Sequence, residues 1–63
     1  MTFADKVKFV RKKLGISQEK MAVLLEVSFA TVNRWEKGHS MPTYVAQEKF
    51  RLLCKENNIT IEE

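Results

Sequence analysis

The stretch of residues 14–38, LGISQEKMAVLLEVSFATVNRWEKG, decides the fold of this chain. Ser17 and Ser28 each stand before a run with the apolar spacing of a helix, and a serine hydroxyl can accept a hydrogen bond from a free backbone N–H at a helix N-cap. We therefore predict a short helix that ends near Leu25 and a second one over about 29–37 that carries Val32 and Trp35 inward. The apolar side of the first of these helices consists of Met21, Ala22, Leu24 and Leu25. Only a three-residue turn separates them, which is typical of a helix-turn-helix unit.

Two more predicted helices flank this unit. Thr2 begins a capping box, so we predict a helix over 3–14, which Gly15 ends in the left-handed conformation. Thr43 caps a further helix over about 44–56. The expected fold class is therefore all-α: a compact bundle of four to five short helices around a central helix-turn-helix.

The end of the chain leaves two possibilities open. Thr60 and Glu63 have capping-box spacing, so residues 59–63 are either a short tail or the truncated start of a fifth helix. In both cases we expect a single domain over 1–63, because a chain of 63 residues has room for only one.

The fourth predicted helix carries more apolar surface than one core contact needs. Its apolar residues cover about 200° of the helix, against the roughly 100° of a single buried face. They are Val45, Ala46, Phe50, Leu52, Leu53 and Cys54. We expect either Ile59 or a second copy of the chain to cover the excess.

Composition excludes several classes of protein. Hydrophobic residues at 44% and charged residues at 30% are typical of a soluble globular chain, and no apolar run is long enough for a membrane span. One cysteine makes no intrachain disulfide, and no Cys/His cluster has zinc spacing. The potential catalytic side chains are scattered, so we expect no enzyme, no metal, no cofactor, no membrane and a cytoplasmic location. They are Asp5, Ser17, His39 and Cys54.

The charge is unevenly distributed along the chain. The formal net charge is +3, but residues 1–37 alone hold eight basic and four acidic side chains. A polyanion would therefore be attracted to the first half, although a solvated helical surface explains the same charges.

Several positions carry a resemblance to a known family. They are Gly15-Ile16-Ser17-Gln18, Ala22, Val27-Ser28, Thr31-Val32, Arg34-Trp35-Glu36, Gly38 and Pro42. With this spacing the chain resembles the lambda-repressor-like helix-turn-helix family, also called the xenobiotic-response-element type, over about 3–42. The resemblance implies an all-helical domain that binds operator DNA, usually as a symmetric dimer, and often represses transcription.

The second helix of such a unit fits the DNA major groove. The outward positions of the predicted helix are then Phe29, Ala30, Asn33 and Arg34, with Lys37 one turn further. Arg34 can bind guanine, Asn33 can pair with adenine, and Phe29 or Ala30 can contact a thymine methyl. The alternatives are a phosphate contact or an exposed ion pair for Arg34, and plain solvent exposure for Asn33.

The resemblance also implies contacts to DNA phosphates. Gln18 would hold a phosphate at the start of the second helix, where free N–H groups and the helix dipole favour an anion, and Ser17 would add its amide or hydroxyl. Ser17 as a cap alone is the alternative. The segment after the third helix would contribute Lys37, His39, Ser40, Thr43 and Tyr44. His39 is a loop histidine rather than a metal ligand, because no partner has ligand spacing.

Arg11 and Glu36 match a family pair that joins the first and third helices, so we predict an ion pair that fixes the third helix; Arg11 can also reach phosphate. Ala22 matches a position where the two helices of the unit pack closely. The chain departs from the family at Glu26, where glycine is usual, and at Phe29, which replaces a polar residue. The segment 42–59 is about three residues longer than the family leads us to expect.

Sequence-specific binding of double-stranded DNA by a homodimeric transcriptional regulator, a repressor, is the function that we expect. A protein-interaction module of the same fold, such as an antitoxin-like partner, is the alternative, because fold does not dictate function. The polar side chains at Gln18, Asn33, Arg34 and Lys37 favour DNA.

Overall fold

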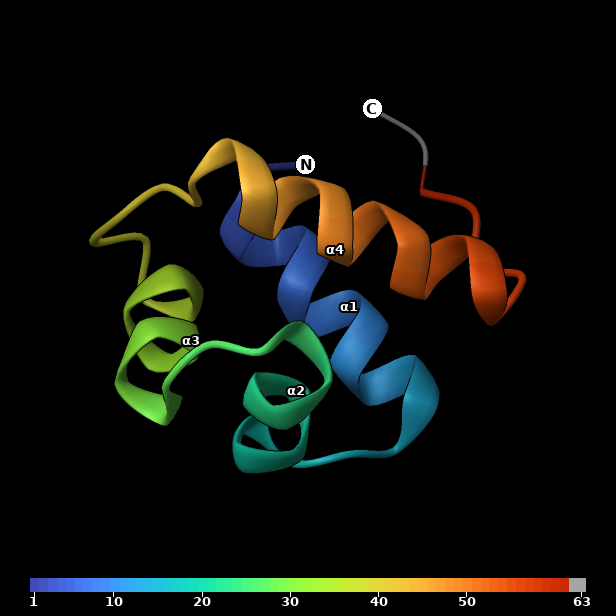
Figure 1. Cartoon of the computed structure of the whole chain (residues 1–63), viewed down its shortest axis with the longest axis horizontal. Coiled ribbons are helices and arrows are strands. Elements are labelled where there is room, and N and C mark those ends of the chain that lie inside the picture. The colour runs from blue at the N-terminus through green and yellow to red at the C-terminus, as the bar shows by residue number, and fades with distance from the viewer. Residues whose placement is uncertain (62–63) are drawn as a thin grey trace.

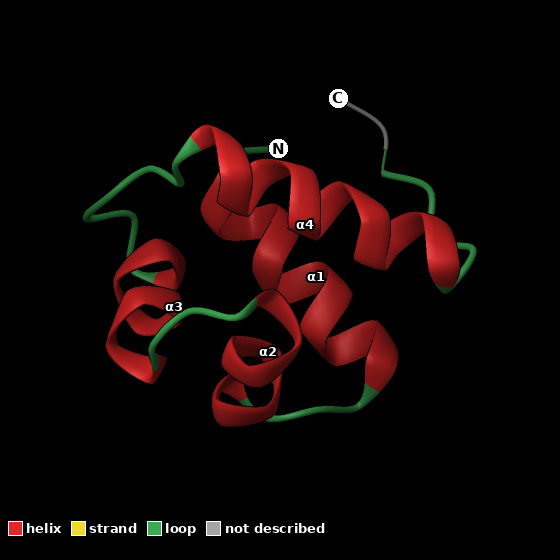
Figure 2. Ribbon diagram, viewed as in Figure 1, coloured by secondary structure: helices red, strands yellow, loops and turns green. Residues whose placement is uncertain are grey.

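The structure is a computed structural model that describes residues 1–61. Within this part of the chain it contains four helices and no strand: α1 (Phe3–Leu14), α2 (Gln18–Leu25), α3 (Phe29–Glu36) and α4 (Tyr44–Glu56). α3 lies at one end of the molecule, on the left of Figure 1, and packs against α1 and α2, while α2 also contacts α4. Figure 2 shows that short loops join all four helices. The all-α prediction is confirmed.

Each helix begins at the residue that the sequence indicated. The Thr2 hydroxyl accepts a hydrogen bond from the Asp5 N–H at 3.1 Å, and the Asp5 carboxylate accepts one from the Thr2 N–H at 3.3 Å. Ser17, Ser28 and Thr43 cap the other three helices in the same way. These contacts span three residues along the chain, so local sequence is enough to specify them.

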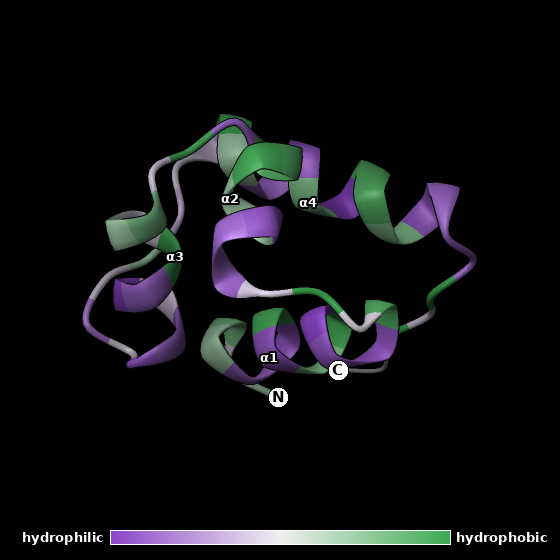
Figure 3. Cartoon of the chain, turned by 90° about the horizontal axis from the view of Figure 1, so that it is seen from below, coloured by the Kyte–Doolittle hydropathy of each residue, from purple (hydrophilic) through white to green (hydrophobic). Residues whose placement is uncertain are grey.

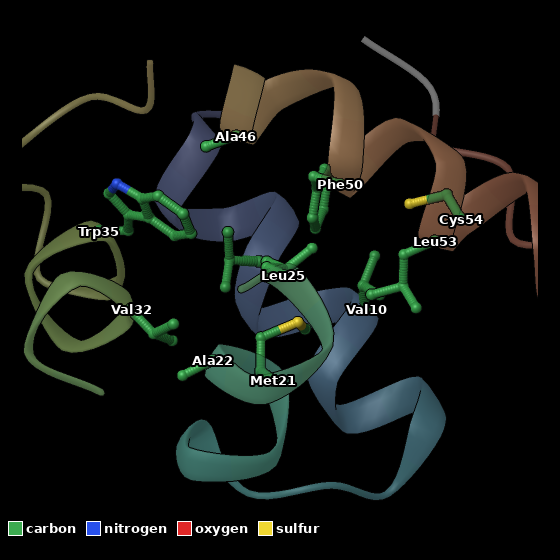
Figure 4. Packing of buried hydrophobic residues seen from close by; sticks show 11 residues of the cluster. Val10, Met21, Ala22, Leu25, Val32, Trp35, Ala46, Phe50, Leu53 and Cys54 are labelled. Carbon is green, nitrogen blue, oxygen red and sulfur yellow. The ribbon is translucent and has the colours of Figure 1, made fainter. Parts of the chain in front are cut away.

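The core is made where the four helices meet (Figure 4). The completely buried side chains are Val7, Val10, Met21, Leu25 and Val32. Trp35 of α3 is 2% exposed, and the ring of Phe3 meets the rings of Trp35 and Phe50 edge to face at 5.3 Å. Since Phe3 belongs to α1 and Phe50 to α4, these three rings connect both of these helices to α3.

The structure departs from the expected apolar face of α2 at one residue, and it leaves part of the expected wide apolar arc of α4 exposed. Leu24, which we assigned to the apolar side of the second helix, is 40% exposed. Val45 and Leu52 of α4 are 62% and 48% exposed, whereas Ile59 packs against the core. Figure 3 shows that hydrophobic and hydrophilic residues alternate along α4. Ile59 therefore does not cover the whole apolar arc of α4.

After α4 the chain turns back toward the core. Asn58 has a left-handed backbone with φ 55°, and the Ile59 N–H donates to the Cys54 carbonyl at 2.9 Å. Residues 59–61 are not helical, and Glu63 of the expected capping box lies outside the described residues. None of the helices described is both long enough and apolar enough to span a bilayer.

Candidate nucleic-acid interface

α3 has one buried side and one exposed side. Val32, Trp35 and Glu36 are buried, whereas the side chains that we assigned to base reading point outward or are partly covered. Phe29 is 50% exposed, and Ala30, Arg34 and the following Lys37 are exposed, while Asn33 is half-buried. We call Phe29, Ala30, Asn33, Arg34 and Lys37 the reading face. The core contacts of α3 keep the reading face outside the molecule.

The turn before α3 is tight and left-handed. Glu26 has φ 57° and ψ 43°, and the Val27 N–H donates to the Ala22 carbonyl at 3.0 Å. A left-handed backbone is the reason that glycine suits this position. In this chain the Glu26 carboxylate accepts a hydrogen bond from Lys49 Nζ at 2.8 Å, and this contact lowers the pKa of Glu26.

Arg11 and Glu36 form a two-point ion pair between α1 and α3. Arg11 Nε donates to Glu36 Oε2 at 2.7 Å, and Arg11 Nη2 donates to Oε1 at 3.0 Å. Arg11 Nη1 also donates to the Ile16 carbonyl at 3.3 Å. Since three of its nitrogens have protein partners, Arg11 holds α3 and the loop before α2 at the same time.

The Glu36 carboxylate stays ionised although it is only 7% exposed. Burial raises its pKa, but hydrogen bonds from Arg11 and Gln18 and the charges of Arg11 and Lys8 outweigh burial, so the pKa lies below its ordinary value. A buried carboxylate is tolerated when such partners compensate its lost hydration.

Gln18 links the start of α2 to the reading face. Its Oε1 accepts a hydrogen bond from Asn33 Nδ2 at 3.2 Å. A hydrogen bond from the Gln18 side chain is also among the effects that lower the pKa of Glu36. Sequence reasoning named Gln18 and Asn33 for separate roles and missed their contact. Nothing in their spacing along the chain could reveal it, because it depends on how α2 and α3 pack.

Apart from Arg11 on α1, the residues assigned to phosphate binding lie in two places. Ser17 is exposed, and its hydroxyl accepts the Lys20 N–H at 3.0 Å, so it is a helix cap at the start of α2. The segment that joins α3 to α4 carries the second set (Figure 1). In this set Lys37, His39, Thr43 and Tyr44 are exposed and Ser40 is half-buried. The Thr43 hydroxyl caps α4 by accepting the Ala46 N–H at 3.2 Å.

A surface groove lies away from the reading face. It measures about 440 Å³, and Phe3, Phe50, Cys54 and Ile59 line it with the start of α1 and the tail. Burial raises the pKa of the Cys54 thiol, which disfavours the reactive thiolate. No group of three potential metal ligands occurs within residues 1–61. The expectation that the chain is not an enzyme stays a prediction.

Comparison with known proteins places the chain in a class. The family model described as helix-turn-helix matches residues 7–63, so the chain belongs to the helix-turn-helix family. This finding confirms the resemblance to lambda-repressor-like proteins. The chain is 35% identical over 43 residues to the HTH-type transcriptional regulator DicA of Escherichia coli (strain K12). That match covers 68% of this chain and 32% of DicA, so it spans about a third of that curated relative. No solved structure gives a significant match.

Proposed function

We propose that this chain binds double-stranded DNA with sequence specificity, as part of a transcriptional regulator. The observation that carries the proposal is the exposed reading face of α3, next to buried Val32 and Trp35 on its other side. A helix held in this way by its neighbours can enter the major groove without rearrangement. The similarity to a transcriptional regulator supports the same function.

Each residue of the reading face has a role in this proposal. Arg34 donates to the O6 and N7 atoms of a guanine, and Asn33 pairs with an adenine. Because Asn33 Nδ2 uses one hydrogen for Gln18, its other N–H and its Oδ1 remain for the base. Phe29 and Ala30 contact thymine methyl groups, since neither side chain can donate a hydrogen bond.

Phosphate contacts position the reading face in the groove. Gln18 and Ser17 bind a phosphate at the N-terminus of α2, where unpaired N–H groups and the helix dipole favour an anion. Lys37, His39, Ser40, Thr43 and Tyr44 bind phosphates on the other side of α3, and Arg11 uses its remaining donors for the same purpose. These contacts carry affinity rather than base preference.

A homodimer is the assembly that we propose on DNA. Val45 and Leu52 lie seven residues apart on one side of α4 and stay 62% and 48% exposed. Burying them against a second copy removes apolar surface from water. Two reading faces then contact two half-sites that are about 34 Å apart, which predicts a palindromic operator.

Selection from random duplex DNA tests the proposal. We expect enrichment of a palindrome whose binding weakens steeply with salt. Enrichment of a single half-site would contradict the dimer and leave DNA binding intact. If no sequence is enriched, the half-exposed Phe29 on the reading face favours the second candidate, a protein-interaction module such as an antitoxin-like partner.

A further inference from the structure

α1 has two flanks, and the structure assigns each to a different neighbour. Arg11 bonds to Glu36, so the flank with Arg11 faces α3. Lys6 lines the groove that α4 and the tail form, so the flank with Lys6 faces the other way. Since consecutive helical residues are about 100° apart, Lys8 lies about 60° from Arg11 around the axis of α1 and Lys12 about 100° on the same side. Lys13 lies about 160° from Arg11, next to Lys6.

The basic surplus of the first half of the chain is now located in space. Arg34 and Lys37 account for two cations on the reading face, whereas Lys8, Lys12 and Lys13 are exposed on α1. The helix-turn-helix unit alone does not use these three lysines. They are therefore charges for which the proposed function has so far no role.

Carboxylates near this flank already have partners. Asp5 is hydrogen-bonded to Thr2, and Glu36 is bonded to Arg11. Lys8 stands three positions before Arg11 on α1, so its side chain is a neighbour of the Arg11 side chain that bonds to Glu36. The pKa of Asp5 is lowered first by its hydrogen bonds to Thr2 and also by Lys8. Lys12 stands one turn after Lys8 on α1, and its side chain is exposed to solvent.

We propose that Lys8 and Lys12 bind backbone phosphates of the duplex outside the base pairs that α3 reads. This inference rests on the proposed function. The last turn of α1 leads through Gly15 and Ile16 directly to the N-terminus of α2, where Ser17 and Gln18 hold a phosphate in the proposed complex. Lys8 and Lys12 extend that contact along the same strand, so α1 belongs to the DNA interface.

Three single substitutions separate this role from a general effect of charge. Lys8→Gln and Lys12→Gln each remove one proposed phosphate contact, whereas Lys13→Gln makes the same change in charge on the Lys6 flank, away from Arg11. We expect the first two to reduce the slope of log affinity against log salt by about 0.9 each and to weaken binding about fivefold at 0.15 M salt. Lys13→Gln should change neither quantity, and no variant should alter base preference.

Duplex length locates the contact. On an operator trimmed to the base pairs that α3 reads, Lys12→Gln and the unaltered chain should have the same salt slope, because the outer phosphates are gone. Lys12→Arg should restore the slope on the long duplex. Melting temperature serves as the control for folding, and Lys12 and Lys13, both in the last turn of α1, should have similar small effects on it.

Two results would overturn the inference while leaving DNA binding in place. One is a slope for Lys8→Gln and Lys12→Gln equal to that of the unaltered chain. The other is an equal reduction of the salt slope for all three variants, which would show that the slope depends on the net charge of the chain and not on the position of the lysine. Failure of the unaltered chain to bind any duplex would instead overturn the proposed function, and this inference with it.

Discussion

Two ion pairs in this chain both hold an acidic residue of the helix-turn-helix unit to another helix, but they differ in burial. Glu36, whose side chain is 6% exposed, is held by Arg11 of α1, and Glu26, whose side chain is 72% exposed, is held by Lys49 of α4. The distances are nearly equal at 2.7 and 2.8 Å. Distance therefore does not measure the importance of the pairs. Without Arg11, the buried Glu36 carboxylate would have lost its hydration with no partner to compensate, which costs stability. Without Lys49, the exposed Glu26 carboxylate would be hydrated by water instead.

Removing the buried pair should have the largest effect. Glu36→Ala leaves the Arg11 guanidinium without its partner, and we expect a loss of about 3 kcal/mol, the lower end for a buried pair because Arg11 keeps some exposure. Thermal unfolding should show a melting temperature lower by more than about 10 °C. DNA affinity should fall as well, because the pair orients α3. An effect on affinity alone would contradict the architectural role.

Acid should weaken the chain through the same carboxylate. The pKa of Glu36 is lowered in the folded state, so its contribution to stability is complete above the unfolded pKa of about 4.3 and is lost as pH falls through the folded pKa. Urea unfolding between pH 6 and pH 3 should therefore show falling stability in the unaltered chain. In Glu36→Gln the stability should fall less steeply with pH. If both chains lost stability equally over this pH range, protonation of Glu36 would not be the cause.

Arg34→Ala should separate base reading from architecture. Arg34 is exposed on α3, two residues before Glu36, so its removal should leave the melting temperature within about 2 °C. Loss of a guanine contact should relax preference at one base pair of each half-site by about 1–3 kcal/mol. Binding to a panel of operator variants measures this change. A uniform loss for every sequence would instead indicate that Arg34 contacts a phosphate.

Removal of the exposed Glu26–Lys49 pair should have the smallest effect, and Glu26→Gly should even raise the stability of the fold. Glu26→Gly relieves the left-handed backbone at φ 57° and gives up only a surface contact with Lys49. We expect a rise in melting temperature of about 4 °C. Lys49→Gln removes the same ion pair without changing the backbone and should change the melting temperature by less. A lower melting temperature for Glu26→Gly would show that the Glu26 carboxylate stabilises the fold by more than its left-handed backbone destabilises it.

The two left-handed helix ends show how much local sequence can predict. Gly15 has φ 67° and Glu26 has φ 57°. The left-handed conformation of Gly15 was predicted from its residue type, whereas the resemblance indicated only that glycine is usual at the position of Glu26. The capping residues were equally readable, because each cap depends on a partner three positions away. For the reading face, helical spacing was enough to indicate which residues point outward once Val32 and Trp35 were assigned to the core.

Contacts between helices were much less predictable from the sequence. The hydrogen bond from Asn33 to Gln18 spans fifteen positions, and no local rule connects them. Leu24 was expected on the apolar side of its helix and is 40% exposed, because the neighbours of α2 leave that position uncovered. The Arg11–Glu36 pair could be anticipated only through the family resemblance.

The sequence by itself determined where each helix begins and ends and which residues follow the turn, because these features depend on side chains within one or two helical turns. Only the tertiary structure decided which flank of α1 lies beside α3, which amide Gln18 contacts and which apolar residues of α4 remain in water. Those outcomes depend on how four short helices share one core, and the packing of distant residues is not encoded in any single local pattern.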